Sequence, residues 1–347
     1  MRAAVVTEPG RMEVRELPRP RPGRGEVLVR TAYFSPCGSE YHVYRGEFGD
    51  RVKFPAVLGH EMSGVVEELG EGVEALAVGD RVVLDPILPC GGCPACRDGR
   101  PNACRYLKLV GIDLPGGYGE YVVARAEQWF RLPEEVSLED AALVEVHGIG
   151  VHALRRARVE PGDRVVLLGC GRLGLSVLDV LKELASGAVV AVDVDDFRLE
   201  RARALGAAQT VNAVKEEALG VVLEVTEGEG ADLVIEAVGH YERTPLNPPP
   251  VEMALAMVRQ AGRILLLGQG DERPGIHWRS LVWKEAEILT SRTSRGVFPR
   301  VIRMMREGRL RTDLLVTHRL RVEETPGLFA RYDRGERQVL KALVSFD

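Results

Sequence analysis

The segment Arg164–Asp193 restricts the fold more than any other part of this 347-residue chain. The apolar run Arg164–Leu168 leads directly into Gly169–Gly174, with the sequence Gly-Cys-Gly-Arg-Leu-Gly, and an amphipathic helix is predicted to follow. A second apolar run, Val189–Val192, ends in Asp193, about 20 residues after the last of these glycines. A glycine turn between a strand and a helix, with an acidic residue at that distance, predicts a dinucleotide-binding βαβ unit.

Each glycine of this turn has its own expected role. Gly169 makes the tight turn, Gly171 lets backbone amides approach a pyrophosphate, and Gly174 lets the helix pack close to its strand. Leu173 lies between the last two glycines and belongs to the same predicted cofactor site. The N-terminus of the helix offers unpaired N–H groups and a positive dipole end to the phosphates.

Asp193 predicts the choice of cofactor. Its carboxylate would hydrogen-bond the ribose hydroxyls and repel a 2′-phosphate, so NAD is favoured over NADP. Arg198 argues in the other direction, because a cation there can serve a 2′-phosphate. Asp195 and Asp196 come after the strand and are expected to begin the next helix instead. The alternative for the whole motif is a glycine turn with a helix-capping aspartate.

The pattern of the chain changes near Val151. Before it, short runs bounded by Gly or Pro predict an irregular all-β region, with strands such as Glu26–Arg30, Val65–Leu69 and Arg81–Leu84. After it, apolar runs alternate with amphipathic segments, which predicts βαβ units around a parallel sheet that is buried on both faces. Beyond Asp193 the predicted elements are a helix over Phe197–Leu205, a strand at Asp232–Glu236, a helix over Glu252–Gln260, and strands at Arg263–Leu267 and Glu287–Ser291.

Four of the six cysteines lie close together in the sequence. Because the N-terminus lacks the apolar core of a signal peptide, such a cluster indicates metal ligation before disulfides. The spacing Cys90-x2-Cys93-x2-Cys96-x7-Cys104 suits a closed, tetrahedral zinc site of four thiolates. We expect a structural zinc that stabilises a lobe at about residues 88–106; a disulfide or an iron–sulfur cluster is the alternative.

Cys37, the pair His60-Glu61, and Glu145 form a second candidate set in the N-terminal region. One thiolate, one imidazole and a carboxylate or water oxygen make a zinc site with an open position, which a catalytic zinc requires. Each residue also has an ordinary explanation, as a buried cysteine, a core histidine or a solvated glutamate. Spacing along the chain does not bring them together, so the residues alone leave both explanations open.

The pattern Gly59-His60-Glu61-x2-Gly64-x5-Gly70-x2-Val73 resembles the signature of the zinc-containing medium-chain alcohol dehydrogenases. Cys37-x-Ser39, the four-cysteine lobe, the βαβ unit and Gly262-Arg263-Ile264 extend this resemblance over nearly the whole chain. It is closest to the polyol and threonine dehydrogenase branch, where a glutamate replaces a cysteine as the third zinc ligand.

Glu145 occupies the place of that glutamate, but the sequence departs from the family's usual pattern at two positions. Val146 follows it where a proline is usual, and Glu40 stands where an aspartate usually follows Ser39. These departures concern the substrate rather than the class of reaction.

The resemblance implies an α/β protein with two domains. A GroES-like, mainly β catalytic domain would comprise residues 1–148 and 292–347, and a Rossmann NAD-binding domain with a doubly wound parallel sheet would comprise residues 149–291. It also implies a catalytic zinc on Cys37, His60 and either Glu61 or Glu145, hence two zinc ions per chain. Zinc would polarise the substrate hydroxyl and lower its pKa, so that hydride can pass to the nicotinamide.

Further residues are assigned by the same resemblance. Ser39 would take the hydroxyl proton, and His42 would pass it to solvent through the cofactor ribose; an ordinary surface histidine is the alternative for His42. Arg292 follows a strand that often pairs between subunits in this family, and would contact a polar substrate.

The predicted function is NAD-linked oxidation of a secondary alcohol, of the polyol, sugar or sugar acid class, by a zinc-dependent oxidoreductase. A threonine 3-dehydrogenase shares all of these motifs and is the first alternative. A noncatalytic cofactor-sensing protein is the second, and it would be expected to have lost Cys37, His60 or Ser39. The resemblance also implies a homo-oligomer, in the form of a homotetramer.

The charge of the chain argues against other kinds of partner. Its 46 Lys and Arg stand against 51 Asp and Glu, for a net charge of −5, and no block of like charge stands out. We therefore expect neither a nucleic-acid partner nor a membrane partner. The apolar runs are too short to span a bilayer, so the expected location is the cytoplasm.

Overall fold

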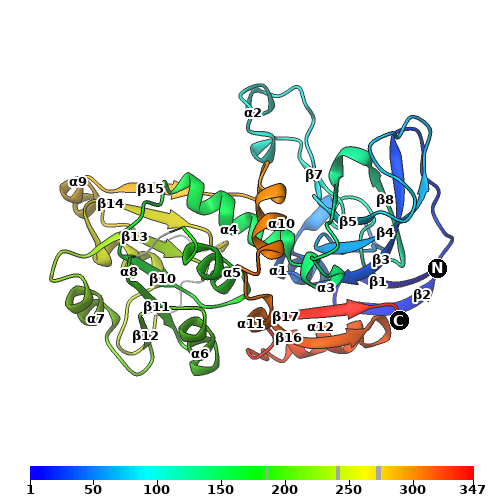
Figure 1. Cartoon of the computed structure of the whole chain (residues 1–347). Coiled ribbons are helices and arrows are strands. Elements are labelled where there is room, and N and C mark those ends of the chain that lie inside the picture. Colours follow the sequence, from blue (N-terminus) through cyan, green and yellow to red (C-terminus); the bar gives the residue numbers. More distant parts are fainter. Residues whose placement is uncertain (185–186, 240–242, 271–274) are drawn as a thin grey trace. The chain divides into compact units, whose positions relative to one another are not determined.

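The structure is a computed structural model that describes residues 1–184, 187–239, 243–270 and 275–347. The chain forms two compact units, both visible in Figure 1. The first is mainly β and comprises Met1–Val146, Arg295–Thr312 and Val316–Asp347. The second is α/β and comprises His147–Ser294 with Asp313–Leu315. The predicted combination of a mainly β unit and a doubly wound α/β unit is therefore confirmed.

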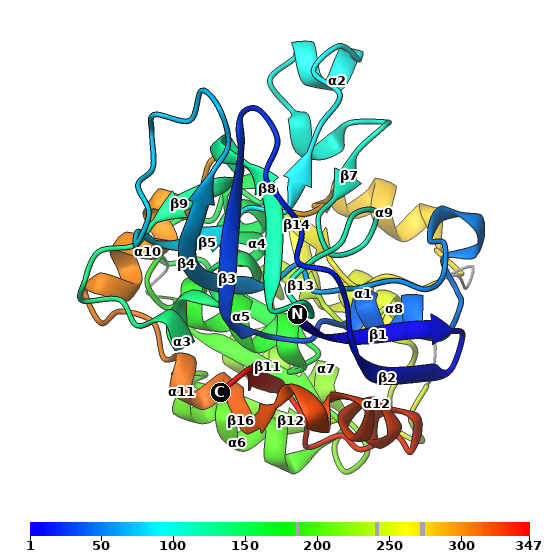
Figure 2. The ribbon, with the colours of Figure 1, turned by 90° about the vertical axis from the view of Figure 1, so that its right-hand side faces the viewer.

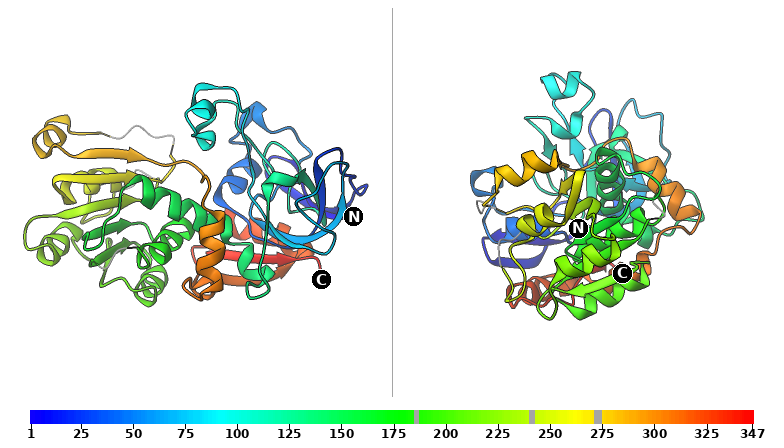
Figure 3. Two further views of the ribbon diagram at one scale, coloured as in Figure 1. Left: turned by 45° about the horizontal axis from the view of Figure 1, so that its top comes forward. Right: turned by 90° about the vertical axis from the view of Figure 1, so that its left-hand side faces the viewer.

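The α/β unit is built on a six-stranded parallel sheet with the order β12-β11-β10-β13-β14-β15. Counted within this unit the order is 3-2-1-4-5-6, the Rossmann order, and helices flank the sheet (Figure 3). The strands are β10 (Val165–Leu168), β11 (Val189–Asp193), β12 (Gln209–Asn212), β13 (Ala231–Glu236), β14 (Val258–Leu266) and β15 (Glu287–Thr290). The first three residues after β10 therefore lie beside the end of β11, where the predicted cofactor residues meet.

The helices associated with this unit are α4 (Val144–Arg156), α5 (Arg172–Leu181), α6 (Asp196–Ala204), α7 (Ala218–Val225), α8 (Pro250–Met257) and α9 (Trp278–Lys284). Asp195 caps α6 by accepting a hydrogen bond from the Arg198 N–H, as its position after the strand predicted. The sequence did not predict β12 or α7. The helix predicted over Glu252–Gln260 is wrong at its end, because Val258 pairs with Ala231 and begins β14.

The mainly β unit contains a seven-stranded sheet whose main path is β16-β17-β3-β4-β5-β9, with β8 added against β3 (Figure 2). A hairpin, β1-β2, and a short pair, β6-β7, complete its strands. Their bounds are β1 (Arg2–Glu8), β2 (Arg11–Glu16), β3 (Glu26–Phe34), β4 (Met62–Leu69), β5 (Arg81–Leu84), β6 (Ile87–Leu88), β7 (Lys108–Leu109), β8 (Tyr121–Arg125), β9 (Trp129–Arg131), β16 (Val316–Arg321) and β17 (Lys341–Ser345).

The C-terminal segment returns to this sheet, because β17 pairs antiparallel with β3 at Val344 and Phe34. The short helices are α1 (Gly38–Tyr44), α2 (Pro94–Arg97), α3 (Leu138–Ala141), α10 (Phe298–Arg306), α11 (Thr312–Leu315) and α12 (Thr325–Asp333). The 3₁₀ turns are η1 (Gly49–Arg51), η2 (Pro101–Ala103), η3 (Ala126–Gln128) and η4 (Val322–Glu324). The N-terminal region is thus less purely β than its sequence predicted.

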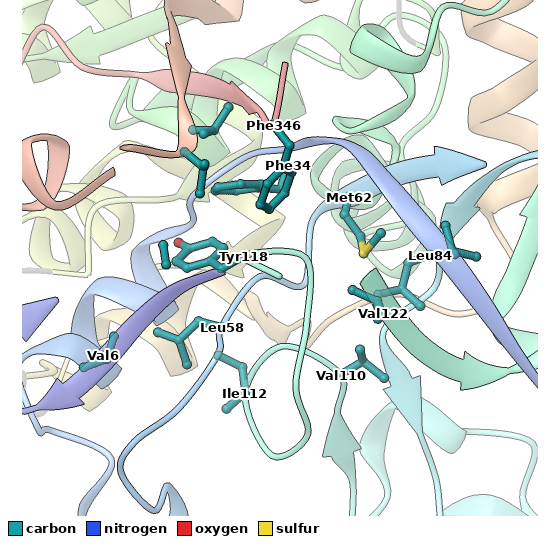
Figure 4. Close-up of a cluster of buried hydrophobic side chains, with 14 of the residues drawn as sticks. Val6, Phe34, Leu58, Met62, Leu84, Val110, Ile112, Tyr118, Val122 and Phe346 are labelled. Carbon is teal, nitrogen blue, oxygen red and sulfur yellow. The ribbon is translucent and has the colours of Figure 1, made fainter. Parts of the chain in front are cut away.

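An apolar core fills the mainly β unit (Figure 4). Phe34 and Phe346 bring β3 and the C-terminus together, and Tyr118 and Met62 lie beside them. The core thus joins the two ends of the chain and supports the residues that flank β4. Among the described residues, no helix combines the length and the apolar character needed to cross a bilayer.

Candidate active site and metal centres

Cys37, His60 and Glu61 converge in the mainly β unit. Strands β3 and β4 pair antiparallel with Phe34 opposite Met62, which brings the residues after β3 next to those before β4. One ligand atom from each of the three residues lies within 4.8 Å of the other two. His60 and Glu61 are buried, and Cys37 is partly exposed. The tertiary structure thus assembles a thiol, an imidazole and a carboxylate that are scattered in sequence.

A buried lysine holds Glu61. Lys341, the first residue of β17, has no exposed surface, and its Nζ lies 2.6 Å from Oε1 and 2.5 Å from Oε2 of Glu61. Both carboxylate oxygens therefore face a cation inside the protein. Sequence reasoning missed Lys341. The signal that could have found it is a lysine at the start of the short apolar strand Lys341–Ser345.

Glu145 lies in the first turn of α4, buried in the same unit. Burial raises the pKa of its carboxyl to about 7; the charge of His60 lowers it and that of Glu61 raises it. Its Oε2 has no hydrogen-bond partner among the described residues. Glu145 is outside the tight group of three ligand atoms, but the charges of His60, Glu61 and Lys341 all affect the pKa of its carboxyl.

These residues fit a zinc ion. A thiol, an imidazole and carboxylates are the ligands that zinc takes in catalytic sites. A buried carboxylate oxygen is costly unless a ligand satisfies it, and Oε2 of Glu145 has no partner in the described part of the chain. A cation would also offset the cost of burying two glutamates beside a single lysine.

His60 is oriented by Glu40, the residue that departs from the usual aspartate. Glu40 is completely buried, and its Oε1 lies 2.7 Å from Nδ1 of His60. Burial would raise the pKa of the Glu40 carboxyl, but the charge of His60 and hydrogen bonds from His60 and Cys37 bring it below its ordinary value. Because Nδ1 faces Glu40, Nε2 is the ring nitrogen left for a metal. Sequence reasoning identified Glu40 only as a departure from the usual aspartate and missed its contact with His60.

Ser39 and His42 lie on α1, which begins directly after Cys37. They are three positions apart, so they share one side of the helix, close to the candidate ligand. His42 is about half exposed, and its Nδ1 lies 2.5 Å from Oε2 of Glu47. Glu47 can therefore orient the half-exposed His42 ring.

The four cysteines form a separate cluster on the excursion that carries α2, at the top of Figures 1 and 2. Their sulfur atoms all lie within 4.8 Å of one another, and those of Cys93 and Cys96 are 3.5 Å apart. Two zinc-bound sulfurs in a tetrahedron are separated by about 3.8 Å, so the arrangement fits zinc. All four are free thiols, which argues against the disulfide alternative.

Two thiols of this lobe have pKa values that are shifted in opposite directions. Backbone N–H groups of Arg105 and Cys96 lower the pKa of Cys93 to about 6. Burial and the neighbouring thiols raise the pKa of Cys96 to about 12. Four thiolates at this separation repel one another, so all four ionise together only around a cation.

The three glycines after β10 have different surroundings. Gly169 has φ of +94°, and a Cβ on Gly174 would lie 1.9 Å from the Gly169 carbonyl oxygen, so neither position accepts a side chain. A Cβ on Gly171, the N-cap of α5, would meet nothing within 4 Å. Leu173 is the second residue of α5. The space beside Gly171 thus lets a phosphate approach the backbone N–H groups at the N-terminus of α5.

Asp193 ends β11 beside this turn. Its Oδ2 accepts a hydrogen bond of 2.7 Å from the Cys170 N–H, and its Oδ1 accepts from the N–H groups of Val194 and Asp195. These bonds hold the carboxylate at the carboxyl edge of the sheet. Nη1 of Arg198 lies 3.9 Å from Oδ2, so the cation considered for a 2′-phosphate is close to Asp193.

Arg292 and the candidate zinc ligands belong to different units. Arg292 is exposed and lies two residues beyond the end of β15, in the α/β unit, whereas Cys37, His60 and Glu61 belong to the mainly β unit. Its role toward a substrate remains a prediction.

A Rossmann unit with an open phosphate-binding turn, joined to a mainly β unit with a Cys-His-Glu cluster and a four-cysteine lobe, defines a metal-dependent dehydrogenase. The chain belongs to the zinc-containing medium-chain alcohol dehydrogenase superfamily. The alcohol dehydrogenase GroES-like domain matches residues 23–134, and the zinc-binding dehydrogenase domain matches residues 173–307.

Relatives in this superfamily span the whole chain. The starvation-sensing protein RspB of Escherichia coli K12 is 31% identical, with 100% of this chain and 99% of that protein covered. Sorbitol dehydrogenase of Bacillus subtilis is 30% identical (99% and 97% covered), and L-threonine 3-dehydrogenase of Pyrococcus horikoshii is 33% identical (92% and 91%). The crystal structure of rspB from E. coli CFT073, described as a short chain alcohol dehydrogenase complexed with NADH, matches with a TM-score of 0.91 at 30% identity, covering 100% and 99%.

The protein is therefore an oxidoreductase of the zinc-type alcohol dehydrogenase class, as its sequence predicted.

Proposed function

We propose that the protein oxidises a secondary alcohol of the polyol, sugar or sugar acid class, with NAD as hydride acceptor and a catalytic zinc at Cys37 and His60. The convergence of Cys37, His60 and Glu61 beside the unpartnered oxygen of Glu145 carries this proposal. The similarity to sorbitol dehydrogenase supports the polyol class. Bound zinc would polarise the substrate hydroxyl and lower its pKa, and bound nicotinamide would accept the hydride.

Side chains of the protein would hold the metal and transfer the proton. Cys37 and His60 hold the metal, with Glu40 orienting His60. Either Glu61 or Glu145 supplies the third ligand, because Glu61 lies in the tight group with Cys37 and His60, and Oε2 of each glutamate has no hydrogen-bond partner among the described residues. Ser39 takes the hydroxyl proton, and His42, oriented by Glu47, passes it to solvent.

The experiment that tests this function measures zinc per chain together with initial rates of NAD and NADP reduction. The substrates are sorbitol-like polyols, sugar acids and threonine. Two zinc ions with NAD-linked turnover of polyols or sugar acids would support the proposal. Turnover of threonine alone would favour the threonine dehydrogenase alternative, which the Pyrococcus relative supports. One zinc and no turnover would favour a noncatalytic, cofactor-sensing protein; the relative RspB is named as a starvation-sensing protein.

We infer that Asp193 selects NAD over NADP. Replacing Asp193 by alanine removes the repulsion of a 2′-phosphate and leaves Arg198 available to it, so the ratio of kcat/KM for NAD to that for NADP should fall about tenfold or more. Asp196→Asn is the matched control, because Asp196 pairs with Lys215 and Asn212, and it should leave the ratio unchanged. An unchanged ratio in Asp193→Ala would show that another group selects the cofactor.

The four-cysteine lobe would hold the second, structural zinc. Its four free thiols and the N–H groups directed at the sulfur of Cys104 suit a metal-bound cluster that needs reduced cysteines. A reducing compartment keeps cysteines in that state, so the cytoplasm is the proposed location.

A homotetramer is the proposed assembly, and α9 with β15 is the surface that supports contact between copies. Trp278, Val282 and Trp283 on α9 are 69–75% exposed, and β15, with the exposed Ile288, forms one edge of the six-stranded sheet. The open edge of β15 can pair with the same strand of a second copy, while adjacent tryptophans exclude water. Trp283→Glu should halve the molar mass in solution measured by light scattering, and the control Val78→Glu should not.

A further inference from the structure

Tyr118 is a fully buried tyrosine whose hydroxyl points at the metal centre's supporting carboxylate rather than at water. It lies just before β8, within the apolar core drawn in Figure 4, and its ring centroid is 4.7 Å from that of Phe34. The hydroxyl donates a buried hydrogen bond of 2.8 Å to Oε2 of Glu40. A phenylalanine would fill the same apolar space, so packing alone does not account for the hydroxyl.

Each oxygen of Glu40 has two polar neighbours. Oε2 accepts from the Tyr118 hydroxyl and from the Cys37 N–H, both at 2.8 Å. Oε1 accepts from the His60 N–H at 2.8 Å and lies 2.7 Å from Nδ1 of the same residue. Glu40 is thus held at one oxygen by Tyr118 and Cys37, and it holds His60 at the other.

The backbone of Tyr118 also contacts the segment that carries His60. Its N–H donates to the carbonyl of Leu58 at 2.9 Å, two residues before His60. Gly59 has φ of +108°, and a Cβ there would lie 2.7 Å from Cδ1 of the Tyr118 ring. The ring therefore packs against the backbone that delivers His60, and its hydroxyl reaches Glu40 from a restrained position.

We propose that Tyr118 is a positioning residue of the metal centre, which acts through Glu40 to hold His60 with Nε2 directed to the metal. This inference rests on the proposed catalytic zinc at Cys37 and His60. Burial and the charge of Glu40 keep the pKa of the Tyr118 hydroxyl well above its ordinary value, so the group stays a donor. Outer partners of this kind typically affect metal affinity 10- to 100-fold, because they fix the orientation of the ligating imidazole.

The test compares Tyr118→Phe with Tyr44→Phe. Tyr44 belongs to the same aromatic cluster, and its hydroxyl donates a hydrogen bond to the Gly10 carbonyl. Tyr44→Phe therefore also removes a hydroxyl hydrogen bond. Zinc affinity is measured by chelator competition on the full chain, and the cobalt-substituted protein is examined by visible absorption. Tyr118→Phe should weaken the more exchangeable zinc by about 10- to 100-fold and shift the cobalt bands. Tyr44→Phe should do neither.

Equal zinc affinities and cobalt spectra in the two variants would overturn the inference and leave Tyr118 a packing residue. If the wild-type chain itself binds only the four-cysteine zinc, the proposed function fails instead, so the two failures are distinguishable. A second variant, Glu40→Gln, keeps the size of the side chain and removes its charge. It should also weaken zinc, and adding Tyr118→Phe to it should cost little more, because Tyr118 acts through Glu40. Fully additive losses would contradict that route.

Discussion

Replacing Cys37 by alanine is expected to reduce the zinc content from two ions to one per chain and to lower kcat/KM about 10³-fold or more. Cys37 is the thiol of the group that includes His60 and Glu61, and the remaining ligands would hold zinc weakly. A catalytic metal contributes several kcal/mol to transition-state stabilisation, which corresponds to this loss of rate. Elemental analysis and initial rates with the best substrate provide the two measurements.

Cys93→Ser is the matched control for Cys37→Ala, because it removes one thiol from the other cluster. It should also reduce the zinc content to one ion, but with a lower midpoint of thermal unfolding, since a structural zinc stabilises its lobe directly. Two zinc ions and full activity in Cys37→Ala would contradict the catalytic role of this site. Unchanged stability in Cys93→Ser would contradict a structural zinc.

Replacing Lys341 by methionine is expected to lower the free energy of unfolding by about 3–5 kcal/mol, because it leaves the buried Glu61 carboxylate without its cation. Methionine is unbranched like lysine and only one heavy atom shorter, so a cavity contributes little to the loss. Urea unfolding of the wild-type and variant proteins, both treated with chelator, gives the difference directly. Chelation matters because a metal ion could otherwise replace the missing charge.

The control for this prediction is the double variant Glu61→Gln with Lys341→Met. Removing both charges avoids an unpaired buried ion, so the double variant should regain most of the stability lost by Lys341→Met. If the single variant were as stable as the double, the buried ion pair would be energetically unimportant and Lys341 would not hold Glu61.

The α/β unit was the easier half to predict from the sequence. Its strand, glycine turn, helix and terminal aspartate occupy one continuous stretch, Arg164–Asp193, and the structure places them in the Rossmann order. Where prediction failed, at Val258–Gln260, pairing with β13 overrode a local helical preference. The strand β12, with the mixed sequence Gln-Thr-Val-Asn, lacks a clear apolar alternation and was missed for that reason.

The candidate active site was predictable only in part. Its ligands could be named by resemblance, but their convergence depends on the register of β3 against β4, which no local pattern specifies. Lys341 contacts Glu61 across 280 residues of sequence, and Tyr118 contacts Glu40 across 78. Contacts of such separation depend on how the whole sheet is assembled.

The sequence by itself determined the class of fold, the phosphate-binding turn and the four-cysteine lobe, because each rests on residues that are neighbours in the chain and on short-range conformational preferences. Only the tertiary structure decided that Lys341 faces Glu61 and that Glu40 and Tyr118 support His60. The physical reason is burial: removing these polar groups from water forces each to find a partner, and the packing of strands and helices that are distant in sequence determines which partner is within reach.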